Sequence, residues 1–186
     1  MTEPALSPIR RSVSVSWDPA AAFRRFTDDF ATWWPSSTHS IGEKRIKRIV
    51  FETRVGGRIF EEHLDGRRFQ WGVVTAWNPP HGVSFSWHPS RPEDTAQQVD
   101  LSFVPEGTGT RLELVSSNWE RWGKGARGAR RGYDVGWGYV LNVWGGKRTL
   151  RMLAMDALVI IAKGVQWARG GVAASIARAE GAMPPA

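Results

Sequence analysis

The chain of 186 residues contains no cysteine. This absence excludes disulfide bonds, thiolate metal ligands and cysteine nucleophiles. Long hydrophobic runs are absent too, since the longest strongly apolar stretch spans only Ala157–Ala162 and is too short to cross a bilayer. Residues 1–11 include two prolines and lack the apolar core of a signal peptide. We therefore expect a cytoplasmic protein with no membrane span.

Patterns that carry enzymatic chemistry are also missing. The four histidines, His39, His63, His81 and His88, show no pair at the helical spacing that suits a metal ion. His63 and His81 fall in or beside predicted turns, which favours a solvated position. The sequence has no Gly-x-Ser-x-Gly elbow and no phosphate-binding loop between a strand and a helix. We expect no metal and no cofactor, and the sequence favours a protein that is not an enzyme.

Tryptophan and positive charge are abundant. The chain has eleven tryptophans and a formal net charge of +7. Such a tryptophan content is typical of an aromatic core or an aromatic-lined pocket. The positive charge is concentrated between residues 121 and 169, so an acidic protein partner would meet the C-terminal third. Nucleic acid is disfavoured as a partner, because these charges alternate with glycine rather than with exposed aromatic residues.

The alternation of apolar and polar residues, interrupted by turn-forming residues, predicts the elements of one domain. Residues 12–17 alternate as a strand, and Asp18-Pro19 then begins one or two short helices with apolar residues at helical spacing. From residue 44 to residue 118 the pattern is an antiparallel meander, in which Asp65-Gly66 marks a hairpin. One face of the meander collects its apolar residues: Phe69, Trp71, Val73, Trp77, Val83, Phe85, Trp87, Val99, Leu101, Phe103, Leu112 and Leu114.

A helix over residues 130–144 is predicted to cover that face. Its apolar stripe consists of Tyr133, Trp137, Val140, Leu141 and Trp144. The glycine-rich segment 123–128 is expected to be a mobile connection before the helix. Gly145-Gly146 predicts a break, followed by a second C-terminal helix and a frayed tail over residues 181–186.

Several short motifs, taken in order, resemble those of a known superfamily. They are Trp17-Asp18-Pro19, Phe26-Thr27-Asp28, Trp33-Trp34-Pro35, Val55-Gly56-Gly57, Trp71-Gly72-Val73-Val74, Asn78-Pro79-Pro80, Phe85-Ser86-Trp87, Phe103-Val104-Pro105-Glu106-Gly107 and Gly136-Trp137. Together they resemble the SRPBCC superfamily of START-like and birch-pollen-allergen-like helix-grip proteins, and most of all the branch named for the activator of heat shock protein 90 ATPase.

The resemblance implies an α+β helix-grip fold with a cavity between sheet and helix. A curved antiparallel sheet of about seven strands would wrap around the long C-terminal helix, with short helices after the first strand and an extra C-terminal helix. We expect an N-terminal arm over residues 1–11, the helix-grip domain over 12–146, and an extension of the same domain over 147–186. The resemblance does not imply one particular reaction, because the superfamily includes lipid carriers, cyclases, stress proteins and chaperone regulators.

The aromatic residues of the sheet and helices are the candidate ligand-binding residues. The expected cavity residues are Trp33, Trp34, Phe69, Trp71, Phe85, Trp87, Trp137, Leu141 and Trp144. A packed core would use the same residues, so this alternative stays open. Of the adjacent Glu61 and Glu62, one could enter the cavity, although an edge salt bridge with Arg58 or Arg67 is the favoured interpretation.

Three functions are compatible with these observations. The first is a non-catalytic module that holds a hydrophobic or aromatic small molecule in the sheet–helix cavity. The second is a chaperone-regulator-like interaction domain for an acidic protein. The third is a cyclase- or hydrolase-like enzyme that uses Glu61 or a histidine.

The extension after residue 146 carries an apolar stripe that needs a cover. Its members are Leu150, Leu153, Leu158, Ile161 and Val165. A monomer rarely leaves such a stripe exposed. We expect it to dock on the flank of its own domain or on a second copy in a symmetric homodimer.

Overall fold

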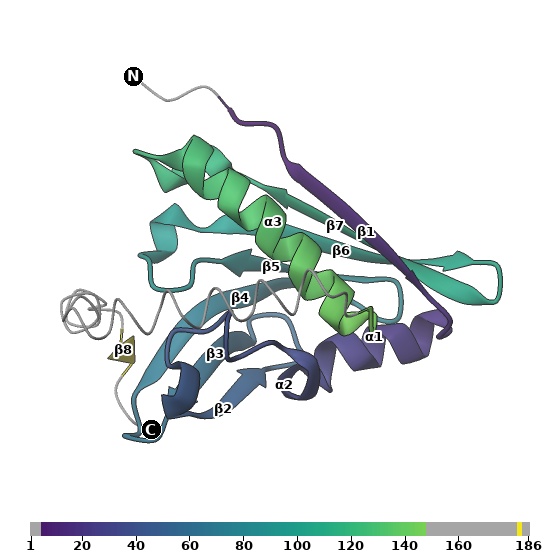
Figure 1. Cartoon of the computed structure of the whole chain (residues 1–186), viewed down its shortest axis with the longest axis horizontal. Helices are drawn as coiled ribbons and strands as arrows, with labels where there is room; N and C mark the ends of the chain where they lie inside the picture. The colour runs from purple at the N-terminus through teal and green to yellow at the C-terminus, as the bar shows by residue number, and fades with distance from the viewer. Residues whose placement is uncertain (1–4, 148–181, 184–186) are drawn as a thin grey trace.

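The computed structural model describes residues 5–147 and 182–183 (Figure 1). Its helices are α1 (Pro19–Thr27), α2 (Phe30–Trp33) and α3 (Ala126–Trp144), with short 3-10 turns η1 (Glu43–Arg45), η2 (Glu93–Thr95) and η3 (Trp119–Trp122). Its strands are β1 (Ile9–Val15), β2 (Ile46–Phe51), β3 (Arg58–His63), β4 (Arg68–Asn78), β5 (Gly82–Trp87), β6 (Gln97–Glu106), β7 (Gly109–Ser117) and β8 (Ala182–Met183).

The strands form one curved antiparallel sheet. The order across it is β1-β7-β6-β5-β4-β3-β2, so β1 and β2, which follow each other in sequence, lie at opposite edges. α1 and α2 connect these two edges, and α3 lies along the concave face (Figure 1). The predicted α+β fold, with about seven strands around a long helix, is confirmed.

Local sequence signals explain where several elements begin. Asp18 caps α1 by accepting a hydrogen bond from the Ala21 N–H at 2.8 Å, and Pro19 occupies the first turn. Asp65-Gly66 separates β3 from β4, as the hairpin signal predicted. One boundary differs. α3 begins at Ala126, so the glycine-rich segment expected to be a connection contributes the first residues of the helix.

The apolar face of the meander packs against α3, as predicted. Trp71, Phe85 and Leu101 on the sheet belong to the same buried cluster as Trp137 and Trp144 on the helix. Trp144 is completely buried. The core therefore fills the space between sheet and helix at the end of α3 nearest α1.

Two strands depart from the predicted pattern. β1 runs from Ile9 to Val15 rather than from residue 12 to 17. In β4, Val74 is buried and Val73 only half-buried, so the expected inward position of Val73 is wrong. The register of β4 shifts against both neighbours, and a bulge of this kind reverses the faces to which later residues point.

The C-terminal predictions lie mostly outside the described residues. The second helix and the stripe from Leu150 to Val165 fall there. The predicted break does not: α3 ends at Trp144, and Gly145-Gly146 follows as a turn, as expected. Within the expected frayed tail, Ala182–Met183 instead forms β8, which pairs with Arg68 and Phe69 at the start of β4. Among the helices that the structure describes, none is long and apolar enough to cross a membrane.

Candidate functional site

A cavity of about 490 Å³ opens between the sheet and the stretch of α3 from Ala129 to Val140. β4 and β5 supply one wall, and α3 supplies the opposite one. The segments after α2, after β5 and in η3 form its rim. The lining residues are Trp34, Thr38, His39, Ser40, Ile41, Trp71, Trp87, Pro89, Ser90, Trp122, Ala129, Gly132, Tyr133, Gly136, Trp137 and Val140.

Four tryptophan rings form the interior surface of this cavity. The Trp34 ring centre lies 5.3 Å from that of Trp71 and 5.6 Å from that of Trp87. Trp137 on the helix lies 5.4 Å from Trp87, so the rings are in mutual contact. Each of the four is at least nine-tenths buried. Because the rings brace one another, they form a rigid apolar surface that suits a flat or hydrophobic ligand.

Small residues on α3 leave the cavity open along its opposite wall. Ala129, Gly132 and Gly136 line the cavity from one face of the helix. A β-carbon added at Gly132 would meet nothing within 4 Å, and one added at Gly136 would first meet His39 Nε2 at 3.8 Å. Larger side chains at these positions would therefore enter the cavity.

The structure separates the nine sequence-predicted residues into two groups. Trp34, Trp71, Trp87 and Trp137 line the cavity. The others do not line it and are buried elsewhere: Trp33, Phe69, Phe85, Leu141 and Trp144. Phe69 packs beside His63, with ring centres 4.4 Å apart.

Sequence reasoning missed the rim and the small face of α3. Thr38, His39 and Ser40 belong to a polar loop whose position depends on tertiary contacts, including a hydrogen bond from Trp34 Nε1 to the His39 carbonyl at 2.8 Å. A signal for the helix wall was present in the sequence. Ala129, Gly132 and Gly136 recur at helical spacing beside the aromatic stripe, which indicates a face with room above it.

Among the described residues that line this cavity there is no Asp, Glu, Lys or Arg, and His39 is the one histidine. Burial raises the pKa of Tyr133 to about 12, and the positive charge of Arg91 partly opposes that rise. The Tyr133 hydroxyl is thus a neutral hydrogen-bond donor at physiological pH. Within residues 5–147 and 182–183, no three His, Asp or Glu side chains gather as a metal site would require.

Glu61 and His63 form a buried polar pair beside the cavity rim. His63 Nε2 lies 2.5 Å from Glu61 Oε1, and Glu61 also accepts hydrogen bonds from the N–H groups of Ile41 at 3.0 Å and Gly42 at 2.6 Å. Glu61 is completely buried and His63 is 2% exposed. The expected solvated position of His63 is therefore wrong, as is the expected edge salt bridge for Glu61.

The pair anchors the cavity rim without lining the cavity. Ser40 and Ile41 line it, and the adjacent N–H groups of Ile41 and Gly42 are held by the Glu61 carboxylate. A β-carbon on Gly42 would overlap the His63 ring, so glycine is required for this approach. Glu61 thus fixes the rim segment against β3.

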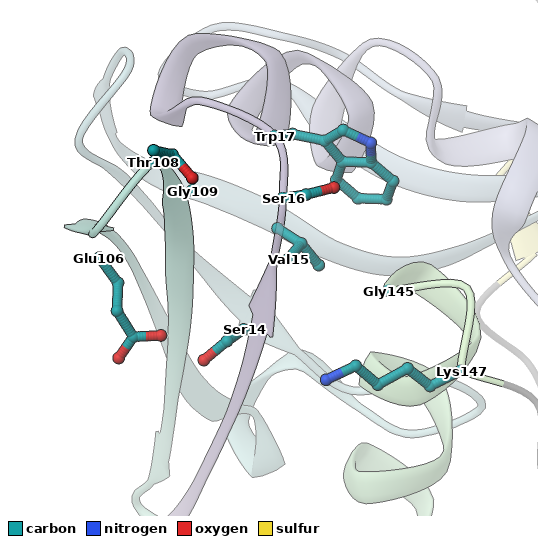
Figure 2. Close-up of a pocket in the computed structure, with 9 residues that line it drawn as sticks. All are labelled: Ser14, Val15, Ser16, Trp17, Glu106, Thr108, Gly109, Gly145 and Lys147. Carbon is teal, nitrogen blue, oxygen red and sulfur yellow. The ribbon is translucent and has the colours of Figure 1, made fainter.

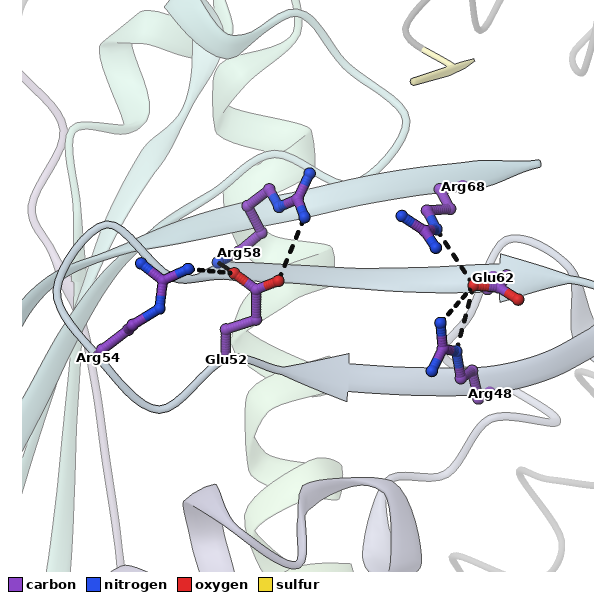
Figure 3. A network of polar contacts seen from close by, with 6 residues as sticks. All are labelled: Arg48, Glu52, Arg54, Arg58, Glu62 and Arg68. Carbon is purple, nitrogen blue, oxygen red and sulfur yellow. Dashed lines mark hydrogen bonds and ion pairs between the residues drawn. The ribbon is translucent and has the colours of Figure 1, made fainter. Parts of the chain in front are cut away.

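Glu62 points to the opposite face of the sheet, as alternation on a strand requires. Its carboxylate pairs with Lys47 at 2.9 Å, Arg48 at 2.7 Å and Arg68 at 3.1 Å, and Figure 3 shows the two arginines on either side of it. These cations, and not the expected Arg58 or Arg67, are its partners. Hydrogen bonds from Lys47 and Arg48 lower the pKa of Glu62 to about 2.

Glu52 makes a second carboxylate cluster on the same outer face. It pairs with Arg58 at 3.3 Å and Arg54 at 3.4 Å (Figure 3). The hydrogen bond from the Arg58 N–H is the main cause that lowers the pKa of Glu52. Both clusters stabilise the convex side of the sheet, away from the cavity.

A second, smaller pocket of about 390 Å³ lies where β1 and β7 meet the end of α3 (Figure 2). Glu106, Lys147 and Trp17 are among its lining residues. Figure 2 shows the Glu106 and Lys147 side chains on opposite sides of the pocket. It lacks the continuous aromatic wall of the larger cavity.

Family comparison agrees with the cavity-bearing fold. The family model described as "Activator of Hsp90 ATPase homolog 1-like protein" matches residues 17–143. The chain belongs to this family. No curated protein matches its sequence. The matched range covers α1, α2, β2–β7 and nearly all of α3, and it contains every residue that lines the larger cavity.

Solved structures share the fold of this Activator of Hsp90 ATPase homolog 1-like chain. Protein MLL2253 from Mesorhizobium loti is 18% identical, with a TM-score of 0.53 over 80% of this chain and 97% of that one. The Aha1 dimer from Colwellia psychrerythraea is 15% identical, with a TM-score of 0.52 over 77% and 100%. The synthase Txn09 is 30% identical, with a TM-score of 0.49 over 85% and 100%. The first two show a common fold.

Proposed function

We propose that this protein binds a hydrophobic or aromatic small molecule in the cavity between its sheet and α3. The observation that carries the proposal is the cavity itself, about 490 Å³ in volume, whose described lining includes six tryptophan and tyrosine side chains and no Asp, Glu, Lys or Arg. Small-molecule sites typically have volumes of about 300–1,000 Å³ and mostly apolar walls with a few polar groups. The tryptophans that touch this space therefore do more than fill a core.

A neutral fluorescent aromatic amine, N-phenylnaphthylamine, is a suitable probe for this function. We expect binding with one-to-one stoichiometry, enhanced probe emission and quenched tryptophan emission. Gly136→Leu places a side chain into the cavity and should abolish binding. Since leucine is a better helix former than glycine by about 0.8 kcal/mol, the variant should fold at least as stably as the wild type.

Gly128→Leu is the matched control for this experiment. Gly128 also lies in α3, is exposed, and does not line the cavity. A β-carbon there would meet nothing within 4 Å. This variant should bind the probe as the wild type does. Equal binding by the wild type and Gly136→Leu, measured by isothermal titration, would contradict the proposal.

A protein-interaction role is the second candidate. It is favoured by the family model and by exposed basic residues at the start of α3, including Lys124, Arg127 and Arg131. An acidic surface on a partner such as an Hsp90-type chaperone would complement them. Stimulation of a purified chaperone ATPase that disappears in the triple glutamine variant at these positions would support this role, and unchanged ATPase activity would refute it.

A further inference from the structure

Arg91 places a positive charge beside the cavity, although Arg91 is not itself among the described residues that line it. It lies in the segment after β5, and its guanidinium covers the ring of the lining residue Trp122 at 4.0 Å. It also donates hydrogen bonds to the Trp122 carbonyl at 3.0 Å and to Thr95 Oγ1 at 3.3 Å. A guanidinium has five N–H donors, so several remain for another acceptor.

The backbone around this cation is held in place, and the described residues supply it with no carboxylate partner. His88 Nδ1 lies 3.0 Å from the Arg91 carbonyl, and the His88 N–H binds the Trp71 carbonyl at 2.7 Å. The Arg91 side chain is half-buried. Its side chain hydrogen-bonds to Thr95 and Trp122. Glu93 and Asp94 in the following turn are exposed, and within the described part of the chain neither forms an ion pair with Arg91.

Tyr133 supplies a second donor at the same end of the cavity. Its ring lies 5.7 Å from that of Trp122, and the charge of Arg91 acts on its hydroxyl. The described residues include no recorded hydrogen-bond partner for that hydroxyl.

We propose that the ligand of this cavity is an aromatic anion. Its ring system lies against the four tryptophans, and its carboxylate, phenolate or sulfonate group binds at the rim between the Tyr133 hydroxyl and the Arg91 guanidinium. This inference rests on the proposed function and narrows its ligand class. An anion at a partly desolvated arginine gains a charge-assisted hydrogen bond, whereas the same group among the tryptophans would lose its hydration.

Two probes that differ by a single sulfonate test the inference. Anilinonaphthalenesulfonate is N-phenylnaphthylamine with an added sulfonate group. Arg91→Gln should weaken binding of the sulfonate probe about tenfold, which corresponds to about 1.4 kcal/mol. The same variant should change binding of the neutral probe by less than about twofold. Tyr133→Phe should act in the same direction, and Arg91→Lys should restore part of the affinity because it keeps the charge.

Arg10→Gln is the control for net charge. Arg10 is exposed on β1, at the far edge of the sheet, and its removal should affect neither probe. If Gly136→Leu prevents both probes from binding, both probes bind in the cavity.

The possible outcomes separate the two proposals. Equal effects of Arg91→Gln on the two probes, or no effect on either, would overturn the anion inference while leaving the proposed function intact. If the neutral probe fails to bind the wild type, the proposed function fails, and this inference fails with it.

Discussion

Replacing Glu61 with alanine should destabilise the protein strongly, because three donors would lose their acceptor. These are His63 Nε2 and the N–H groups of Ile41 and Gly42, at distances of 2.5, 3.0 and 2.6 Å from the Glu61 carboxylate. A buried donor without a partner costs about 1–3 kcal/mol. Because the rim segment can move towards water, the measured loss of stability will be smaller than the sum of three such costs. We expect a loss of about 3–5 kcal/mol, as for other broken buried pairs.

The neighbouring Glu62→Ala variant provides the comparison. Of its three partners, Lys47 and Arg48 have side chains that are 59% and 52% exposed, so water can solvate them after the substitution, whereas Arg68 at 18% is less accessible. The free energy of unfolding, from urea titrations followed by tryptophan fluorescence, should therefore fall less for Glu62→Ala than for Glu61→Ala. A loss for Glu61→Ala no greater than for Glu62→Ala would refute the assignment of Glu61 as the anchor of the rim.

Three further outcomes are expected. Gly42→Ala should destabilise the protein, because its β-carbon overlaps the His63 ring, and thermal unfolding would measure this. Trp137→Ala removes a side chain that is 3% exposed and should cost about 3–5 kcal/mol in urea unfolding. The pKa of Glu62 is lowered from 4.5 to about 2, so its stabilising effect should be full above pH 4.5 and disappear as the pH falls towards 2. The stability difference between wild type and Glu62→Gln should shrink over that range; a constant difference would contradict it.

Periodicity was sufficient to predict the layers of this fold. Alternation in β5 and β6, helical spacing in α3 and the Asp18 cap depend on neighbours close in sequence, and all three predictions are confirmed. The bulge in β4 could not be predicted in this way. It depends on how two flanking strands register against β4, and this information is spread over distant parts of the chain.

The site was predictable only in part for a related reason. Trp71, Trp87 and Trp137 lie on predicted inward faces, so they were identifiable as residues between sheet and helix. Which inward residues border empty space, and which are packed, depends on the volumes of the side chains opposite them. Trp144 is equally inward but is covered by Trp17, with ring centres 5.4 Å apart, and by Phe26 at 6.0 Å.

The position of β1 has a consequence for the folding pathway. β1 precedes every other described strand, yet among these strands it pairs with β7 alone, where Ile9 lies opposite Ser116. Contacts between residues so far apart in sequence form slowly, because the intervening chain must close a large loop first. On a ribosome, β1 would emerge long before its partner strand. We therefore expect β1 to be among the last strands to gain protection from hydrogen exchange during refolding, although it is synthesised before the other described strands.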